Sequence, residues 1–317
     1  MPKPDYEWEY DNRARVADSE TLVAKWETDA AAFREEWPHA TYDIAYGPGK
    51  RDDVDIFWPE DRDETAPMVV FVHGGYWRSR SRKDFSHLAR GLVETGHAVA
   101  MPSYSLAPDA HILAIVREVQ QCCIFLHRTY ERPLTAIGHS AGGHLAACLF
   151  ATEWTELDPA LPRELIRAGL GLSGIYDLMP LLQTTQNETI GLDEEFAHAA
   201  SVHRWRPIGV RRFEAWAGGD ETPEYRRQSR TLVTAWRMLG IGAKMEVMGG
   251  ANHFTIVDPL TDANSNLVRR VADLVRQPEL TLQKPTRESA EKNEAEKETA
   301  GASVEKQRPS DVRPVKG

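Results

Sequence analysis

Short apolar runs alternate with longer segments of helical periodicity along most of the chain. The clearest run is MVVFV, Met68 to Val72, in which no polar position interrupts the apolar ones. A strand without polar alternation is typical of a parallel sheet that is covered on both faces. Further runs of this kind predict strands in HAVAMPSYS, LTAIGHS, AGLGLSGIYD, FEAWAGGDE and AKMEVMGG.

The segments between these runs have helical periodicity. Residues 84–95, for example, place Phe85, Leu88, Leu92 and Val93 on one face. Repeated alternation of strand and helix predicts an α/β fold, with a mostly parallel sheet between two layers of helices. Further helices are predicted over residues 109–130, 141–152, 223–239 and 254–275.

Three segments depart from this rhythm. ATYDIAYG and DVDIFWP predict an opening β-hairpin around the turn at Gly47. An N-terminal helical segment, about residues 1–40, contains a predicted helix over residues 19–37. Residues 178–212 are rich in Thr, Gln, His and Arg, and they predict a small cap inserted above the carboxyl edge of the sheet.

The C-terminal residues differ in composition from the rest. Residues 278–317 contain no aromatic side chain and mix charges of both signs. Such a segment cannot bury enough apolar surface to offset the entropy of ordering. We therefore predict one folded domain over residues 1–277 and a disordered charged tail over residues 278–317.

Charge and cysteine content narrow the class of protein. The net charge is -10, which disfavours a nucleic-acid partner. No apolar stretch is long enough to span a membrane, and the N-terminus has no apolar signal-peptide core. Three cysteines, two of them adjacent, favour a reducing compartment over a disulfide framework. We expect a cytoplasmic protein with a small-molecule substrate, and a homodimer is one assembly that the sequence leaves open.

The motif Gly-x-Ser-x-Gly occurs once, at residues 138–142, and it stands between an apolar strand and a helix. This strand–turn–helix context is the one that a nucleophile elbow requires. Ser140 is therefore the candidate nucleophile. A phosphate-binding loop would need a lysine before the serine, and none is present.

Two further segments follow predicted strands and complete a candidate site. In HGGYW, residues 73–77, the backbone N–H groups of Gly75 and Tyr76 are expected to form an oxyanion hole together with that of Ala141. His253 follows the last strand and is the candidate general base.

The candidate acid lies after the strand that ends in FEAWAGGDE. Asp220 is the preferred residue, because the order serine, acid, histidine is that of hydrolases with a nucleophile elbow. Asp177 and Glu221 are rivals. No metal-ligand spacing and no dinucleotide fingerprint is present, so we expect neither metal nor cofactor.

Together, HGGYW, GHSAGGHLA, SGIYDL, GGDETPEYRRQS and NHF resemble the animal-type kynurenine formamidases (arylformamidases). These are serine hydrolases of the α/β-hydrolase fold, near the hormone-sensitive-lipase-like esterases. The resemblance implies Ser140, Asp220 and His253 as the catalytic triad and HGGYW as the oxyanion loop. It also implies hydrolysis of N-formyl-L-kynurenine to formate and kynurenine.

Such a substrate would need an aromatic wall and a partner for its amino-acid end. Trp77, Tyr104 and Tyr176 are the candidate wall residues. Arginines in or beside the predicted cap could bind a carboxylate, although such clusters are more often solvated surface. The arginines concerned are Arg204, Arg206, Arg211 and Arg212.

Two alternative functions remain: a carboxylesterase for small acyl esters, and a non-catalytic binding protein with the same fold.

Overall fold

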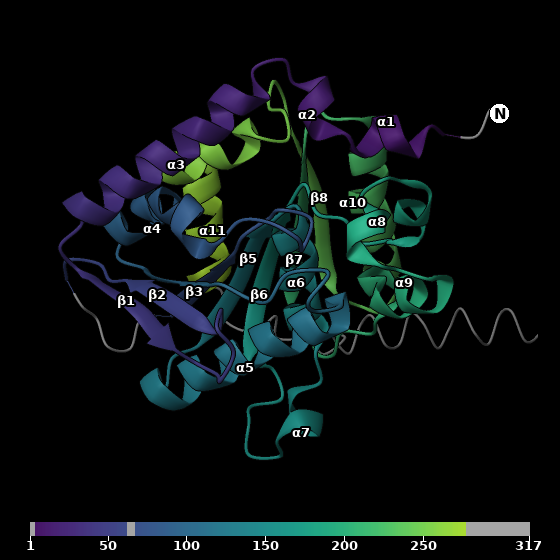
Figure 1. Cartoon of the computed structure of the whole chain (residues 1–317). Coiled ribbons are helices and arrows are strands. Elements are labelled where there is room, and N and C mark those ends of the chain that lie inside the picture. The colour runs from purple at the N-terminus through teal and green to yellow at the C-terminus, as the bar shows by residue number, and fades with distance from the viewer. Residues whose placement is uncertain (1–3, 62–66, 277–317) are drawn as a thin grey trace, which may run out of the picture. The chain divides into compact units, whose positions relative to one another are not determined.

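The computed structural model describes residues 4–61 and 67–276 (Figure 1). Its centre is an eight-stranded sheet in the order β1-β2-β4-β3-β5-β6-β7-β8. The predicted disordered tail, residues 278–317, lies outside the described residues. The strands are β1 (Ala40–Ala45), β2 (Asp53–Phe57), β3 (Met68–Val72), β4 (Ala98–Pro102), β5 (Leu134–His139), β6 (Ile166–Leu172), β7 (Arg212–Gly218) and β8 (Gly242–Met248).

Strands β4 to β8 and β3 pair in parallel, whereas β1 and β2 are antiparallel to their neighbours. The predicted hairpin and the predicted parallel sheet are therefore both confirmed. A register shift interrupts the β1–β2 pairing between Thr41 and Ile44. Because all the parallel strands run in one direction, their carboxyl ends share one edge of the sheet.

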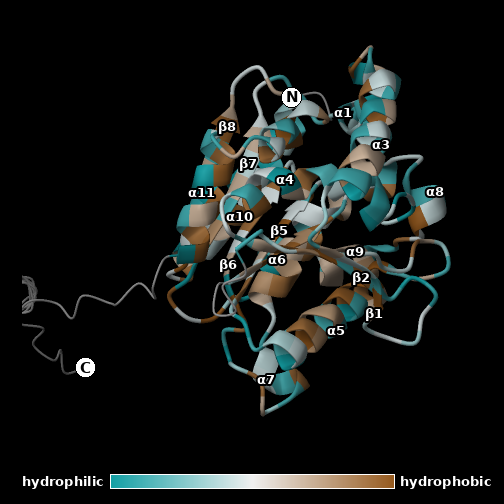
Figure 2. Ribbon diagram, turned by 90° about the vertical axis from the view of Figure 1, so that its left-hand side faces the viewer, coloured by the Kyte–Doolittle hydropathy of each residue, from teal (hydrophilic) through white to brown (hydrophobic). Residues whose placement is uncertain are grey.

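Helices cover both faces of the sheet, as the alternation predicts. Alternate residues of β3 belong to different apolar clusters, since Val70 packs on one face and Phe71 on the other. Figure 2 shows apolar and polar positions alternating around α5 and α11. One face carries α5 (Ile112–Tyr130), α6 (Ala141–Ala151) and α10 (Pro223–Met238), and the other carries α3 (Ser19–Glu36), α4 (Arg90–Glu94) and α11 (Asn266–Arg276).

Two predicted helices are interrupted. Residues 82–89 form a 3₁₀ helix, η1 (Arg82–Ala89), before α4 begins. The predicted helix over residues 254–275 divides into η4 (Thr255–Thr261) and α11. Pro259 lies inside η4, where it lacks the N–H that would continue an α-helix. A new start follows, because the hydroxyl of Ser265 accepts a hydrogen bond from the N–H of Val268 at 3.0 Å.

Short helices lie at the carboxyl edge of the sheet. The segment predicted as a cap contains η2 (Met179–Gln183), α8 (Asn187–Ile190), α9 (Glu194–Ala200) and η3 (Val202–Arg204) between β6 and β7. Two N-terminal helices, α1 (Tyr6–Tyr10) and α2 (Asn12–Arg15), precede α3. A further short helix, α7 (Trp154–Leu157), follows α6 at the opposite edge (Figure 1).

Several residue types that often have reactive or ligand-binding roles are buried in the core instead. Cys122, Cys123 and Cys148 are fully buried free thiols. Trp236 stacks on Phe150 with ring centroids 5.4 Å apart. These side chains fill the core of the domain.

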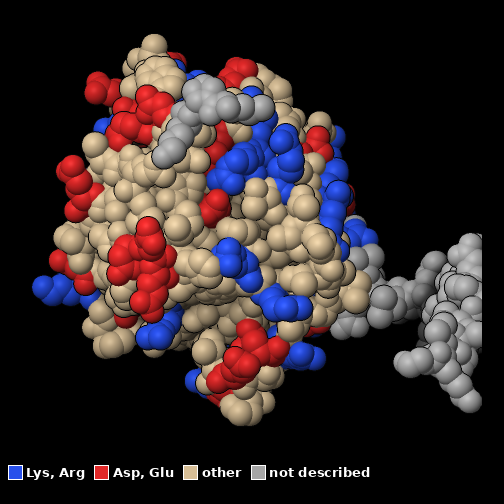
Figure 3. Space-filling model, turned by 90° about the vertical axis from the view of Figure 1, so that its right-hand side faces the viewer, with Lys and Arg blue, Asp and Glu red and all other residues tan. Residues whose placement is uncertain are grey.

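Neither sign of charge covers the face shown in Figure 3, where acidic and basic side chains form separate small groups. Some of these charges form ion pairs: Arg227, on α10, pairs with both Asp177 and Glu224. Within the described residues, every helix is too short or too polar to cross a membrane.

Candidate active site

Ser140 occupies a sharp turn between β5 and α6. Its backbone has φ 56° and ψ -119°, a strained conformation for a residue with a side chain. Its N–H donates to the carbonyl of Leu172 at 2.8 Å, which anchors the turn to β6. A Cβ at Gly138 would lie 2.1 Å from the Gly142 carbonyl oxygen, and one at Gly142 would lie 2.0 Å from that of Val72. The two glycines are therefore needed for the turn.

His253 is held by a buried carboxylate. Its Nδ1 donates to Oε1 of Glu221 at 2.6 Å, and both side chains are almost fully buried. The other carboxylate oxygen accepts from the hydroxyl of Ser173 at 2.7 Å and from the N–H of Gly218 at 2.6 Å. With Nδ1 protonated towards the carboxylate, Nε2 of the neutral ring is the proton acceptor.

The preference for Asp220 as the acid is wrong. Asp220 is exposed at the tip of the turn after β7, whereas the next residue, Glu221, reaches His253. The turn is fixed by Gly219, whose N–H donates to Met248, and by the N–H of Asp220, which donates to Ala251. These bonds direct the first acid outwards and return the second, longer one to the site.

The loop after β3 also has an unusual backbone. Gly75, Tyr76 and Trp77 have φ values of 114°, 50° and 54°. The carbonyl of Gly75 accepts the N–H groups of Arg78 and Ser79, both at 3.0 Å. Ala141 is the first residue of α6, so its N–H has no intrahelical acceptor. Backbone N–H groups in this loop and at the start of α6 can stabilise an oxyanion.

Two further histidines, His73 and His139, support the site through hydrogen bonds to backbone carbonyls. The Nδ1 of His73 donates to the Gly74 carbonyl at 2.7 Å, its ring stacks on Tyr104, and burial lowers its pKa to about 3. The Nε2 of His139 donates to the backbone carbonyl of His253 at 2.8 Å. Burial lowers the pKa of His139 well below its usual value, so the ring is neutral. No role was assigned to His139 from the sequence, although this residue directly precedes the candidate nucleophile.

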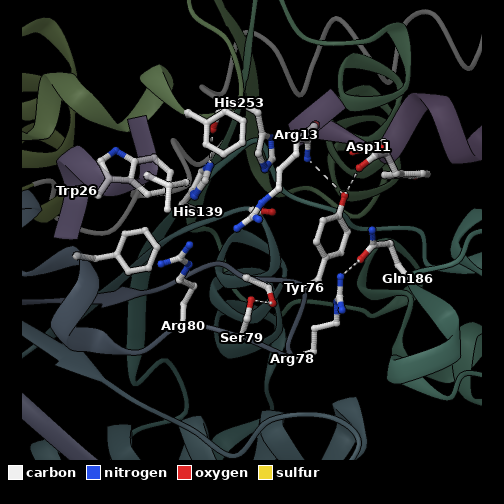
Figure 4. Close-up of a pocket in the computed structure, with 17 residues that line it drawn as sticks. Asp11, Arg13, Trp26, Tyr76, Arg78, Ser79, Arg80, His139, Gln186 and His253 are labelled. Carbon is white, nitrogen blue, oxygen red and sulfur yellow. Dashed lines mark hydrogen bonds between the residues drawn. The ribbon is translucent and has the colours of Figure 1, made fainter. Parts of the chain in front are cut away.

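Ser140 and His253 line the same pocket, a cavity of about 350 Å³. Trp26 forms the centre of an aromatic side, with ring centroids 5.3 Å from Phe85 and 5.7 Å from Phe254. Figure 4 shows Trp26 and His139 on one side of the cavity and Tyr76 on the other.

The three predicted wall residues do not line this pocket. Trp77, Tyr104 and Tyr176 are fully buried in the core. Trp77 packs edge-on against His144, and Tyr104 stacks on His73 with centroids 4.3 Å apart. These aromatic side chains follow strands, as a ligand wall would, but they are enclosed by the apolar core on one face of the sheet.

The predicted cap arginines also lie elsewhere. Arg211 is buried, and it donates to the carbonyls of Ile166 and Phe150, so its role is structural. None of Arg204, Arg206 and Arg212 lines the pocket. The arginines that do line it are Arg13, Arg78 and Arg80.

The N-terminal helices close one side of the pocket through Tyr76. Its hydroxyl donates to the backbone carbonyl of Tyr10 at 2.7 Å, and it lies 3.1 Å from the hydroxyl of Tyr225. The amide of Asn12 donates to Tyr225 at 2.7 Å, and the Tyr10 hydroxyl donates to Glu224 at 2.6 Å. The sequence predicted an N-terminal helical segment but not these pocket contacts.

Metal ligands are not assembled at this site. Across residues 4–61 and 67–276, no group of three or more His, Cys, Asp or Glu side chains could hold a metal ion.

Several known proteins are similar to this chain in sequence or in fold. The BD-FAE family model matches residues 54–202. The kynurenine formamidase of Danio rerio is 31% identical over 240 residues, which cover 74% of this chain and 81% of the relative. An isoprenylcysteine alpha-carbonyl methylesterase of Arabidopsis thaliana is 31% identical over 154 residues, covering 45% of this chain and 36% of that protein.

A solved structure extends the comparison. A protein of Silicibacter sp. TM1040, provisionally described as a thioesterase, superposes with a TM-score of 0.76 and 32% sequence identity. The match covers 85% of this chain and all of that one, 100%. The sheet order, the turn at Ser140 and these likenesses confirm an α/β-hydrolase. The chain belongs to the kynurenine formamidase family.

Proposed function

We propose that this protein is a serine hydrolase that cleaves the formamide bond of N-formyl-L-kynurenine, releasing formate and L-kynurenine. The observation that carries the proposal is the buried His253–Glu221 pair in the same pocket as the strained Ser140. Its substrate follows from family membership, since kynurenine formamidases match 71–74% of this chain at 28–31% identity.

The proposed first step is attack of the Ser140 hydroxyl oxygen on the formyl carbon. His253 takes the hydroxyl proton at Nε2, and Glu221 stabilises the imidazolium through Nδ1. The oxyanion that develops on the formyl oxygen is held by the N–H groups of Gly75, Tyr76 and Ala141.

Collapse of this intermediate breaks the C–N bond. His253 returns its proton to the departing aryl amine, and a formyl ester remains on Ser140. Water then attacks the ester with His253 as base, and formate leaves as the serine hydroxyl is restored. Because formyl is the smallest acyl group, most of the cavity is available for the aryl part, and the aromatic side at Trp26, Phe85 and Phe254 suits a ring.

A carboxylesterase acting on small acyl esters is the second candidate. The methylesterase relative favours it, because the same machinery would serve an ester. A non-catalytic binding protein on the same fold is disfavoured, because all three members of the proposed triad are present. The cellular setting of the proposal is the cytoplasm, which agrees with three free, buried cysteines. Light scattering would test the homodimer against a monomer.

The deciding experiment compares hydrolysis of N-formyl-L-kynurenine with that of p-nitrophenyl acetate and butyrate, using the wild type and Ser140→Ala. We expect kcat/KM for the formamide to exceed that for both esters, and Ser140→Ala to abolish all three activities. Rapid ester hydrolysis with negligible formamide turnover would retain the triad and replace the substrate. Undiminished activity in Ser140→Ala would overturn the mechanism.

A further inference from the structure

The pocket beside Ser140 carries an excess of positive charge. Three arginines line it, against one acidic residue, Asp11. Asp11 is already engaged, because its side chain accepts the N–H of Ala14 at 3.0 Å and caps α2. Arg80 is paired with Glu27. The charges that remain for a ligand are those of Arg13 and Arg78.

Arg13 is the less engaged of the two. Among the described residues its guanidinium makes no hydrogen bond or ion pair, whereas that of Arg78 donates to the neutral amide of Gln186 at 2.7 Å. Figure 4 shows Arg13 extending into the cavity between His253 and Tyr76, with Arg78 and Gln186 beyond Tyr76. A cation in this position faces the space that a substrate would fill.

The backbone that carries Arg13 is tied to the site. The neighbouring Asn12 donates to the hydroxyls of Tyr225 and Tyr76, at 2.7 and 3.4 Å. The carbonyl of Arg13 accepts the hydroxyl of Ser19 at 3.1 Å. These bonds fix the start of the arginine side chain relative to the loop after β3. Arg15, two residues later, instead lies over the ring of Trp8, 4.9 Å from its centroid, and does not line the pocket.

We infer that Arg13, assisted by Arg78, forms a subsite for the carboxylate of the substrate's amino-acid side chain. The inference rests on the proposed function and deepens it. A guanidinium presents parallel N–H donors that match the two oxygens of a carboxylate. With the formyl carbon at Ser140, the substrate's aryl ring lies towards Trp26 and its amino-acid end towards Arg13. The subsite selects amino-acid formamides over neutral aryl formamides.

Solvation limits the size of the effect. Arg13 is exposed to water, and exposed ion pairs contribute little, whereas bonds from a guanidinium to a carboxylate in a partly enclosed pocket contribute more. We expect loss of the guanidinium to raise KM about tenfold, the change that corresponds to one well-formed charged hydrogen bond. Because the carboxylate is remote from the reacting bond, kcat should be unaffected.

The test crosses two variants with two substrates. Arg13→Gln and the matched control Arg15→Gln, from the same short helix, are assayed on N-formyl-L-kynurenine and on its decarboxylated analogue, N-formylkynuramine. We expect Arg13→Gln to raise KM for the carboxylate substrate alone, and Arg15→Gln to change neither substrate. Arg13→Lys should give an intermediate KM, since it keeps the charge but not the paired donors. An equal change on both substrates, or an unchanged KM, overturns the subsite.

Binding measured without turnover separates this inference from the proposed reaction. Calorimetric titration of the wild type and both variants with L-kynurenine and kynuramine reports the subsite even if no formamide is hydrolysed. We expect the wild type and Arg15→Gln to prefer the carboxylate ligand, and Arg13→Gln to lose that preference. Equal affinity of the wild type for both ligands contradicts the subsite, while failure to hydrolyse N-formyl-L-kynurenine contradicts only the proposed function.

Discussion

The Nδ1 atom of His253 lies 2.6 Å from Oε1 of Glu221, and the exposed Asp220 precedes that glutamate by one residue. Of two adjacent carboxylates in one turn, one is therefore exposed to solvent and the other is buried against the histidine. Glu221 receives three donors, from His253, Ser173 and Gly218, and this fixes both its orientation and that of the imidazole.

Replacing Glu221 by Gln should reduce kcat by about 10³- to 10⁴-fold, because the amide no longer holds the required histidine tautomer or stabilises the imidazolium. Asp220→Asn is the matched control and should retain nearly full activity. Steady-state kinetics of both variants would decide the assignment. If Asp220→Asn loses more activity than Glu221→Gln, the acid has been misassigned.

Ser173→Ala should lower the free energy of unfolding by about 1–3 kcal/mol, since it removes a hydroxyl donor from a buried carboxylate. Activity should fall as well, because Glu221 loses one of its restraints. Ser229→Ala provides the comparison: that hydroxyl is also buried, but it has no hydrogen-bond partner among the described residues. Denaturant titration and kinetics would be measured on both. Equal losses in the two variants would count against a special role for Ser173.

Tyr76→Phe should release the N-terminal helices from the pocket, because the hydroxyl's bond to the Tyr10 carbonyl is lost. We expect destabilisation by about 1–2 kcal/mol, faster hydrogen exchange in α1 and reduced kcat/KM. Tyr46→Phe is a suitable control, as it removes a 2.6 Å bond to the carbonyl of Ser103 away from the pocket. The control should lose stability without loss of activity. Unchanged exchange in Tyr76→Phe would argue against this anchoring.

Stability should fall as pH decreases below about 6.5, in part because buried neutral histidines resist protonation. Burial lowers the pKa of His73 to about 3 and that of His144 to about 4. The unfolded chain then binds more protons than the folded one, so the contribution is complete above the unfolded pKa and is lost on acidification. At pH 5 the loss is about 2 kcal/mol for each ring.

His144→Gln should flatten this dependence by removing one such ring. The free energy of unfolding would be measured at pH 7 and pH 5, and the difference between the two should shrink by about 2 kcal/mol. His198→Gln changes an exposed histidine and should leave the difference as in the wild type. Identical pH dependence in His144→Gln and the wild type would refute the assignment.

The elements that could be predicted from sequence are those whose burial or backbone conformation is evident in a local pattern of residues. The uninterrupted apolar run at Met68–Val72 indicates a strand buried on both faces, and it is one. The turn at Ser140 could be predicted from the two glycines around it, because a side chain at either position would clash with a backbone carbonyl. The choice between Asp220 and Glu221 depends instead on hydrogen bonds from Gly219 to Met248 and from Asp220 to Ala251, which join residues 29 and 31 positions apart and leave no local sequence pattern.

The pocket lining was harder to predict for a related reason. An aromatic residue near a strand end, such as Tyr104, can either line a ligand pocket or pack in the core. Which of the two occurs depends on the helices and loops that cover it, and these cannot be read from the local sequence. The residues that do line the pocket include Arg13 and Trp26, from helices whose approach to the sheet depends on long-range contacts. Their sequence neighbourhood has no feature that distinguishes it from an exposed helix.

The bond from His139 to the carbonyl of His253 has a mechanical consequence. His139 is joined covalently to Ser140, so one peptide linkage and one hydrogen bond connect the serine to the loop that carries the imidazole. Thermal displacement of the β5 terminus therefore moves both reacting groups together. Their mutual alignment is protected from fluctuations that shift the two loops relative to the rest of the sheet.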